Sequence, residues 1–284
     1  MVIDAHVHLY PTPERGAQAK GRNEPPYGTL AELNDALGTV LDAAVVANFL
    51  PAQLMRERGG ASDADLWTRQ RRQNDWALEV AQRDERLHVL VGALPVSDER
   101  AHTDVEAWLA HASCCGIKLH PSAGGYRADD PAVLELAALA ADADQAVMVH
   151  AGPFAPGHRD VGADELRELA RATTGRLVVA HLGGAGPDTA AAIAGVRAGV
   201  WLDTSAILTS STADGARELL WGVLDAIGDE RLIHGSDVPF FGIAESLDRL
   251  RASLPPDVRT DRVLAANATA AYLSATPRTP RSSP

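Results

Sequence analysis

Eight short apolar stretches, rich in Val, Ile and Leu, recur along the chain, and segments with helical spacing separate them. The apolar stretches lie near residues 2–9, 41–50, 87–94, 116–120, 146–150, 176–181, 199–205 and 231–236. Segments such as 132–143, 163–172 and 215–227 are long enough for the crossover that a pair of parallel strands requires. Eight strands that alternate with helices predict a single (β/α)8 TIM barrel of the α/β class. A doubly wound open sheet would give a similar pattern and stays as the alternative.

The composition is that of an ordinary globular protein. The chain has 284 residues, of which 46% are hydrophobic and 23% charged, and no apolar run approaches the roughly 18 residues of a membrane span. Its 26 basic and 38 acidic residues give a net charge of −12, which disfavours nucleic acid or an anionic membrane as a partner. The two cysteines are adjacent, and no signal peptide is evident. We therefore expect a cytoplasmic protein, with a lone disulfide in an exported protein as the alternative.

Two long connections follow the first and second predicted strands. Residues 10–28 hold four prolines amid Gly and charged residues and predict a loop, and residues 51–65 predict a second insertion. Loops after barrel strands build the active face, so both are candidates to cover a substrate. A solvated surface excursion is an equal alternative for the second insertion. The last residues, 276–284, contain three prolines and no apolar run, and we expect them to be disordered.

Five of the ten histidines close an apolar stretch, and an aspartate closes the last one. These residues are His6, His8, His120, His150, His181 and Asp237. The spacings from His120 to His150 and from His150 to His181 each match one strand plus one helix. If the strands are parallel, all these side chains converge on one rim of the barrel.

The first pair is the most informative, because a strand repeat of two residues puts His6 and His8 on one face and Val7 on the other. Both imidazoles can therefore reach one ion. Imidazoles and a carboxylate at the carboxyl end of a barrel predict a site for Zn²⁺ or a similar metal, with a position left open for water. A single histidine at a strand end would be structural; five histidines with an aspartate favour the metal site.

At this point the chain resembles the amidohydrolase superfamily, and within it the amidohydrolase-related group that also contains nonoxidative decarboxylases of the aminocarboxymuconate semialdehyde type. The resemblance spans essentially the whole chain. Its motifs are Ile-Asp-Ala-His-Val-His from residue 3, Gly-Ile-Lys-Leu-His-Pro from 116, Val-His-Ala-Gly from 149, Ala-His-Leu-Gly-Gly from 180, Leu-Asp-Thr-Ser from 202, Gly-Ser-Asp-Val-Pro from 235, and Asn-Ala from 267.

The resemblance implies a distorted barrel over residues 1–275 that binds one divalent metal, with Zn²⁺ expected first and Mn²⁺ or Fe²⁺ as alternatives. The implied ligands are His6, His8, His150 and Asp237. The resemblance also implies that His181 is the catalytic histidine beside the metal-bound water. In a hydrolytic reaction Asp237 would take the proton from that water and pass it to the leaving group.

Other polar residues near the strand ends receive separate interpretations. Lys118 and His120 share a strand face, and we expect them to bind the substrate through an anionic group; the alternative is a carboxylated Lys118 that bridges two metals, as in some members of the superfamily. Asp4 is expected on the face of the first histidine pair, where it could orient a ligand, with a purely structural role as an equal alternative. Asp203 either supports the site or ends a strand as a helix cap. His234 is expected to be structural, because alternation turns it away from the site.

The predicted activity is that of a metal-dependent hydrolase, which uses an activated water to cleave an amide, cyclic amide or lactone bond of a small molecule. The alternative is nonoxidative decarboxylation of a small aromatic or unsaturated carboxylic acid, although decarboxylases of this group tend to be longer than this chain. A third hypothesis is a barrel that keeps the metal as a structural element and serves as a binding or scaffold protein. Such a chain would lack a metal ligand or the catalytic base, and none of these residues is missing. Four basic residues in the long connections are candidates to neutralise an anionic substrate, with a solvated surface as the alternative: Arg15, Lys20, Arg22 and Arg127. The sequence leaves the oligomeric state open, a homodimer included.

Overall fold

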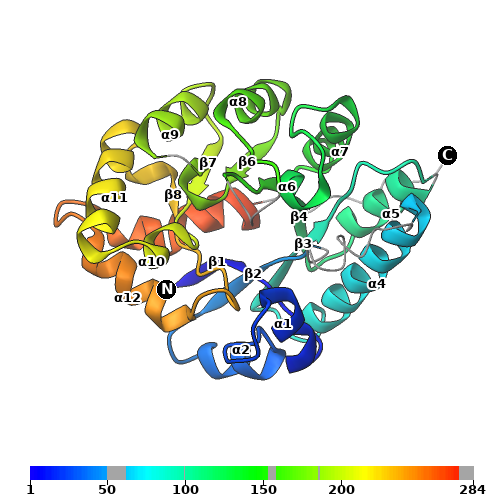
Figure 1. Cartoon of the computed structure of the whole chain (residues 1–284), viewed down its shortest axis with the longest axis horizontal. Helices are drawn as coiled ribbons and strands as arrows, with labels where there is room; N and C mark the ends of the chain where they lie inside the picture. The colour runs from blue at the N-terminus through cyan, green and yellow to red at the C-terminus, as the bar shows by residue number, and fades with distance from the viewer. Residues whose placement is uncertain (50–61, 99, 153–157, 185, 275–284) are drawn as a thin grey trace.

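The computed structural model describes residues 1–49, 62–98, 100–152, 158–184 and 186–274. Eight parallel strands form one sheet in the order β1 to β8, and helices surround it (Figure 1). Each of the eight apolar stretches overlaps a strand, which confirms the predicted (β/α)8 barrel. The strands are β1 (Ile3–Val7), β2 (Ala43–Ala47), β3 (Leu87–Gly92), β4 (Cys114–Leu119), β5 (Ala146–Val149), β6 (Arg176–Val179), β7 (Val200–Asp203) and β8 (Leu232–Ile233).

The barrel closes between the first strand and the segment that contains and follows the short last strand. The backbone N–H of Ala5 donates to the carbonyl of His234 at 3.0 Å, that of Asp237 to His6 at 2.8 Å, and that of His8 to Val238 at 2.8 Å. These bonds place the Gly-Ser-Asp segment directly beside the histidine pair of β1. The closure therefore brings together the first motif of the chain, which starts at residue 3, and the Gly-Ser-Asp-Val-Pro motif, which starts at residue 235.

Helices connect the strands and form the outer layer. The helices that cover the barrel wall are α2 (Leu30–Ala36), α4 (Asp63–Ala81), α5 (Arg100–Leu109), α7 (Pro131–Asp142), α8 (Ala163–Ala172), α9 (Pro187–Ala194), α11 (Ala213–Ile227) and α12 (Ile243–Ser253). The shorter elements are α1 (Pro13–Lys20), α6 (Pro121–Gly124), η1 (His181–Gly183), α10 (Ile207–Ser210) and η2 (Asp229–Arg231). Among the helices of the described residues, none has the length and apolarity to span a bilayer.

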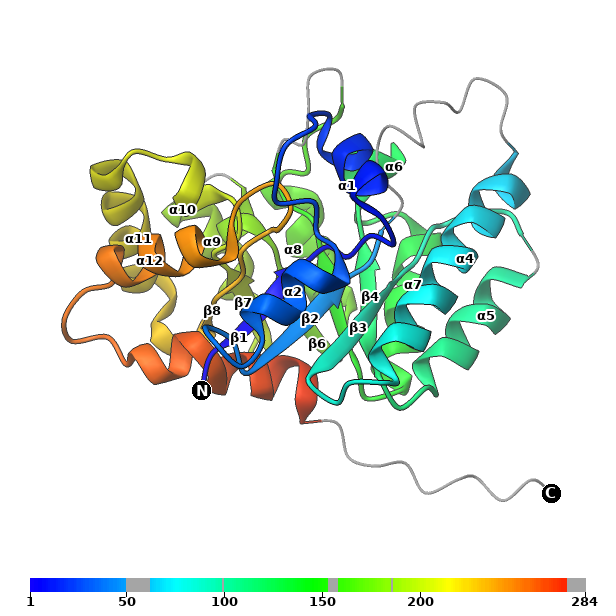
Figure 2. The same cartoon turned by 90° about the horizontal axis from the view of Figure 1, so that it is seen from below.

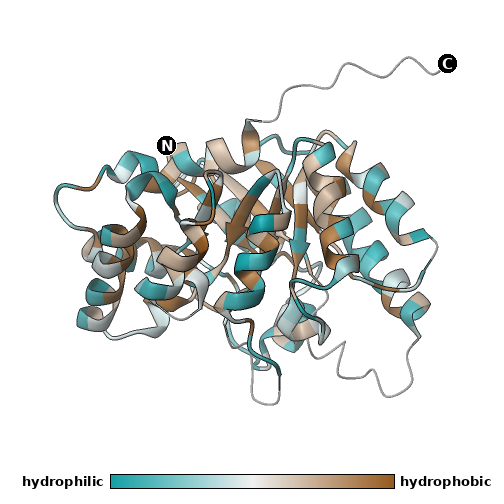
Figure 3. Ribbon diagram, turned by 90° about the horizontal axis from the view of Figure 1, so that it is seen from above, coloured by the Kyte–Doolittle hydropathy of each residue, from teal (hydrophilic) through white to brown (hydrophobic). Residues whose placement is uncertain are grey.

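Apolar side chains fill the barrel on both sides of the strands, as expected for a parallel sheet covered on both faces. The larger cluster lies between strands and helices, and a smaller one fills the interior with residues such as Ala5, Val45, Leu90 and Met148. Figure 3 shows this distribution as brown strands inside helices whose outer turns are largely teal.

The amino-terminal end of the barrel is closed by helical turns from the end of the described chain. These turns, η3 (Arg262–Ala266) and η4 (Thr269–Leu273), run beneath the strands (Figure 2). Ala268 and Tyr272 from this segment belong to the interior cluster. The helices α1 and α6 lie at the other end of the barrel, at the carboxyl ends of the strands (Figure 2).

The loop prediction for residues 10–28 is wrong in part, because α1 forms there. The side chain of Thr12 caps the helix by accepting from the N–H of Arg15, Pro13 occupies its first turn, and Gly21 ends it in the left-handed conformation. Proline at the first helical position lacks only an N–H that would have no helical partner. The proline that indicated a loop therefore begins a helix. Of the second predicted insertion, residues 51–61 lie outside the described residues, and its last residues begin α4 at Asp63. The tail 276–284 also lies outside the described residues.

Candidate active site

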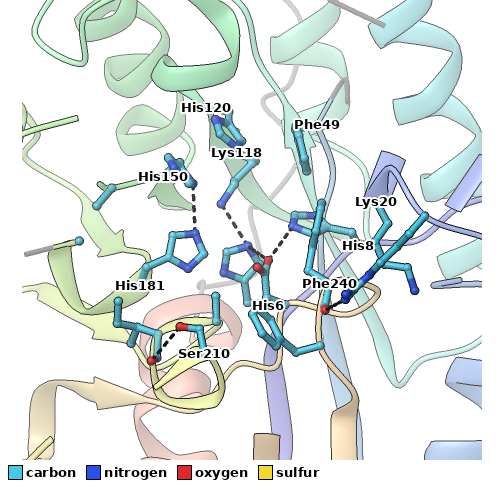
Figure 4. A pocket seen from close by; sticks show the side chains of 17 residues that line it. His6, His8, Lys20, Phe49, Lys118, His120, His150, His181, Ser210 and Phe240 are labelled. Atoms are coloured by element: carbon cyan, nitrogen blue, oxygen red, sulfur yellow. Dashed lines mark hydrogen bonds and ion pairs between the residues drawn. The ribbon is translucent and has the colours of Figure 1, made fainter. Parts of the chain in front are cut away.

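A cavity of about 500 Å³ opens at the carboxyl ends of the strands and contains most of the predicted site residues (Figure 4). Its lining includes His6, His8, Lys20, Arg22, Phe49, Lys118, His120, His150, His181, Ile207, Asp237, Phe240 and Phe241. In Figure 4, His150 and His181 lie on one side, His8, Phe49 and Phe240 on the other, and His6 and Lys118 between them. The alternation of strands and helices thus gathers residues from eight parts of the chain into one cavity.

His6 in β1 and His8 directly after it are held so that the Nε2 atom of each has a lone pair. His6 Nδ1 lies 2.9 Å from a carboxylate oxygen of Asp203, and His8 Nδ1 lies 2.6 Å from the carbonyl oxygen of Ala47. Both oxygens can only accept, so Nδ1 carries the proton in each ring. Burial, together with Lys118, lowers the pKa of His6 to about 3, so this ring is neutral. Such outer partners are typical of histidines that bind metals through the other ring nitrogen.

Asp237 meets this pair from the closing segment. Its carboxylate lies 3.0 Å from His8 Nε2 and 3.6 Å from His6 Nε2. Burial alone would raise the pKa of Asp237, but its contact with His8 and the neighbouring histidines hold it below its usual value. Its backbone has a φ of +68°, an uncommon conformation for a residue other than glycine. Residues held in such conformations are concentrated at functional sites.

The donor atoms of His6, His8 and Asp237 fit a divalent metal. One ligand atom from each lies within 4.8 Å of the others, and all three residues are buried. Two imidazoles and a carboxylate suit Zn²⁺ and similar ions. His150, the fourth implied ligand, lines the same cavity but does not belong to this group.

A second histidine pair occupies the opposite side of the cavity. His181 Nδ1 lies 3.1 Å from the carbonyl oxygen of Ser205, so in the neutral ring Nε2 can accept a hydrogen bond. His150 Nδ1 lies 3.1 Å from that Nε2, and burial, with help from His120, lowers the pKa of His150 far below its usual value. The neutral His150 ring therefore donates to His181. His120 stacks on His150 with ring centroids 3.9 Å apart.

Asp203 connects the two sides, which supports the site interpretation over the helix cap. One carboxylate oxygen binds His6 Nδ1, and the other accepts from the backbone N–H of His181 and from the backbone and hydroxyl of Ser205. The hydroxyl oxygen of Ser205 in turn lies 2.9 Å from Nδ1 of both His6 and His181. Burial would raise the pKa of Asp203, but His6 and the hydrogen bonds hold it well below the usual value. A buried carboxylate thus orients both rings.

Lys118 and His120 reach the cavity from the same strand end, as their spacing predicts. Lys118 is 1% exposed, and its Nζ lies 3.2 Å from both His6 Nε2 and Met148 Sδ. Burial lowers the pKa of Lys118 to about 8, although Asp203 and Asp237 oppose the shift. His120 Nδ1 accepts from the N–H of Ala123 at 3.2 Å. The proton of neutral His120 is therefore on Nε2, where it can be donated.

Two minor predictions have different outcomes. Asp4 does not share the face of the histidine pair, because the register of β1 shifts between Asp4 and Val7 and reverses the alternation. Its carboxylate accepts instead from the backbone N–H of His6 at 3.2 Å and of Ser236 at 2.9 Å, and burial raises the pKa of Asp4 to about 7. His234 is fully buried and does not line the cavity, in line with a structural role.

The aromatic wall of the cavity has no counterpart in the sequence predictions. Phe49 lies 4.6 Å from the His8 ring and 4.7 Å from the His120 ring, measured between centroids, and Phe240 lies 5.9 Å from the His8 ring. Alternation could have found Phe49, because it continues the inward positions of Val45 and Ala47 on β2. Phe240 follows an irregular segment, where no periodicity applies.

The loops after β5 and β6 touch at two glycines, and this contact yields a first prediction. A Cβ on Gly152 would lie 2.8 Å from Gly184 Cα, and φ of Gly152 is +75°. We expect Gly152→Ala to lower the free energy of unfolding by about 2–4 kcal/mol, through backbone strain and overpacking. Gly162→Ala is the control, since its Cβ would meet nothing within 4 Å and should cost about 1 kcal/mol at most. Urea unfolding of both variants measures the difference; equal values would contradict the prediction.

Comparison with known proteins identifies the family to which this chain belongs. Residues 3–273 match the sequence profile of the family described as Amidohydrolase. The chain therefore belongs to the amidohydrolase family. No curated protein matches the chain at a significant level.

Solved structures with the same fold include decarboxylases and hydrolases. The 2,6-dihydroxybenzoate decarboxylase from Rhizobium has a TM-score of 0.70 at 15% identity, with 95% of this chain and 97% of that chain covered. An amidohydrolase from Burkholderia multivorans with bound zinc has a TM-score of 0.65 at 17% identity, with 96% and 99% covered. A probable 2-pyrone-4,6-dicarboxylic acid hydrolase from Acinetobacter baumannii has a TM-score of 0.65 at 14% identity, with 95% and 98% covered. At these identities the likeness shows the shared fold.

Proposed function

We propose that the protein is a metal-dependent hydrolase that cleaves an amide, cyclic amide or lactone bond of a small molecule. The observation that carries this proposal is the position of Asp237. Its carboxylate, with a pKa below the usual value, lies within 3.6 Å of the Nε2 atoms of both His6 and His8. An ionised carboxylate beside a metal position can take a proton from an attacking water.

His6, His8 and Asp237, with His150 from the opposite side, would hold the metal, for which zinc is the first expectation. A divalent cation in that position lowers the pKa of a coordinated water toward neutrality and polarises a carbonyl oxygen. The zinc in the structure from Burkholderia multivorans supports the choice of metal.

The remaining polar residues have roles that follow from their protonation states. Asp237 accepts the proton of the attacking water and returns it to the leaving group. His181 Nε2 accepts from His150 on their shared side of the cavity. If it exchanges this hydrogen bond for one with the substrate, it can act as a base or, when it carries the proton, donate to developing negative charge. His120 donates from Nε2, and the Lys118 ammonium attracts an anionic group of the substrate.

Decarboxylation of a small aromatic or unsaturated acid is the second candidate. The buried Lys118 beside the metal position favours it, because a cation there can bind the carboxylate that is lost. The aromatic side chains Phe49 and Phe240 could also flank an aromatic ring, and the Rhizobium structure is named as a decarboxylase of a dihydroxybenzoate.

A direct assay separates the two candidates. Zinc-loaded protein is incubated with panels of lactones, amides and aromatic carboxylic acids, and acid release and CO₂ are both followed. We expect acid release from a lactone or amide, without CO₂. Release of CO₂ from an aromatic acid, with no hydrolysis, would favour the second candidate, and inactivity toward all three panels would contradict both.

A further inference from the structure

The cavity carries a charge opposite to that of the whole chain. Among the described residues that line it, Lys20, Arg22 and Lys118 are cationic, and Asp237 is the one acid. The chain as a whole has a net charge of −12. A cleft with a local excess of one sign attracts ligands of the other sign. Since Lys118 lies deep beside His6, Lys20 and Arg22 supply a second positive region.

Lys20 and Arg22 come from the end of α1 and the residues after it, and Figure 4 shows Lys20 beyond His8 and Phe240, on the far side from His150 and His181. Of the four basic residues that the sequence offered for an anionic substrate, these two alone line the cavity. Arg15 binds Gln18, and Arg127 binds Asp129.

The two side chains are held in place mainly by backbone carbonyl groups. Lys20 Nζ donates to the carbonyl of Glu24 and, at 2.8 Å, to that of Pro26. Arg22 Nη2 donates to the carbonyl of Phe240 at 2.9 Å. These bonds position both groups without neutralising them. The carboxylate of Glu24 lies 3.2 Å from Arg22 Nε, but both side chains are more than half exposed, so water screens this pair.

The fold keeps the two cations together despite their repulsion. Partial burial, followed by the charge of Arg22, lowers the pKa of Lys20, and the charges of Glu24 and Glu32 oppose this shift. The segment cannot easily move away, because α1 packs against its own returning chain: a Cβ on Gly16 would lie 1.8 Å from the carbonyl oxygen of Tyr27. A bound anion would interact favourably with both of these positive charges.

We propose that Lys20 and Arg22 form an anion subsite at the mouth of the cavity, which binds a carboxylate of the substrate at the end remote from the reacting bond. The inference deepens the proposed function and rests on it for the reacting end. Lys20 has a third N–H, and the Arg22 guanidinium offers a planar fork that matches a carboxylate. Phe49 and Phe240 lie on the same side of the cavity as Lys20 in Figure 4. This arrangement suits a flat molecule with an anionic group at each end.

Binding of aromatic mono- and dicarboxylates tests the subsite without turnover. Isothermal titration calorimetry of isophthalate, terephthalate and benzoate is performed on zinc-loaded and metal-free protein. We expect at least one dicarboxylate to bind about tenfold more tightly than benzoate, and Arg22→Gln to remove that advantage while it leaves benzoate affinity unchanged. Arg15→Gln, the same charge change on α1 outside the cavity, should alter neither.

A second pair of variants separates charge from loop packing at Lys20. Gln at this position keeps an N–H donor but loses the charge, whereas Arg keeps both. We expect Lys20→Gln to weaken dicarboxylate binding about tenfold and Lys20→Arg to preserve it. Equal binding of benzoate and both dicarboxylates by the wild type, or equal effects of Arg15→Gln and Arg22→Gln, would overturn the proposal.

The outcomes also separate this subsite from the proposed function. A protein that discriminates between the acids but hydrolyses no lactone or amide would contradict the hydrolase alone. A hydrolase that shows no such discrimination would contradict the subsite alone.

Discussion

Replacing His6 with alanine is expected to abolish turnover and to leave the protein without stoichiometric zinc. The His6 Nε2 lone pair lies in a group of donor atoms, with His8 and Asp237, whose three residues all line the cavity. Removal of His6 takes away one of the four proposed ligands and breaks the group that it forms with His8 and Asp237, so the ion should be held much more weakly. Elemental analysis should give about one metal per wild-type chain and much less than one in the variant, and activity on any substrate found should fall to background.

His102→Ala is the matched control, because His102 is exposed and lies on α5, outside the cavity. A His6→Ala variant with full activity would remove this residue from the site. Two metal equivalents per chain, with one lost on Lys118→Ala, would show instead that a carboxylated lysine holds a second ion.

Asp203→Asn is expected to damage both the stability of the protein and its affinity for metal. The asparagine amide would present N–H groups or an uncharged oxygen where a fully buried carboxylate now accepts from His6, His181 and Ser205. An N–H facing His6 Nδ1 would force the ring proton onto Nε2, where a metal must bind. We expect a loss of about 3 kcal/mol in the free energy of unfolding of the metal-free protein. Zinc affinity should fall about 10- to 100-fold.

Asp164→Asn provides the comparison, since the Asp164 side chain is 90% exposed on α8 and its ion pair with Arg167 is screened. Urea unfolding and competition with a zinc chelator measure the two effects. Unchanged zinc affinity in Asp203→Asn would show that Asp203 does not control the His6 ring.

Most of the fold follows from the sequence because periodicity and apolar runs are local signals. All eight strands and the three helical segments named in advance occur within a few residues of the expected positions. The parallel arrangement then accounts for the convergence of His6, His120, His150 and His181 on one cavity. Because the carboxyl ends of parallel strands meet at one rim of the barrel, residues that are distant in sequence can be predicted to lie close together.

The failures occur where the chain departs from regular alternation. The register shift in β1 moves Asp4 off the face of the histidine pair, and a capping threonine with a following proline makes a helix of the predicted loop. The role of Ser205 is a tertiary property, because its hydroxyl serves two rings from two other segments. None of these features changes the local hydrophobic pattern from which the predictions were made.

The position of the candidate ligands at the line of closure has a further consequence. His8 and Asp237 are 229 residues apart in sequence and stand on the two edges that meet when the sheet becomes a cylinder. An ion bound to both would cross-link the first and last edges of the sheet, next to a terminal strand of only two residues. The unfolded chain has no such assembled site, so the metal would bind the folded protein in preference. The free energy of metal binding would therefore stabilise the closed barrel. Both the activity of the protein and the stability of its closed barrel would then depend on the bonds between the metal and these ligands.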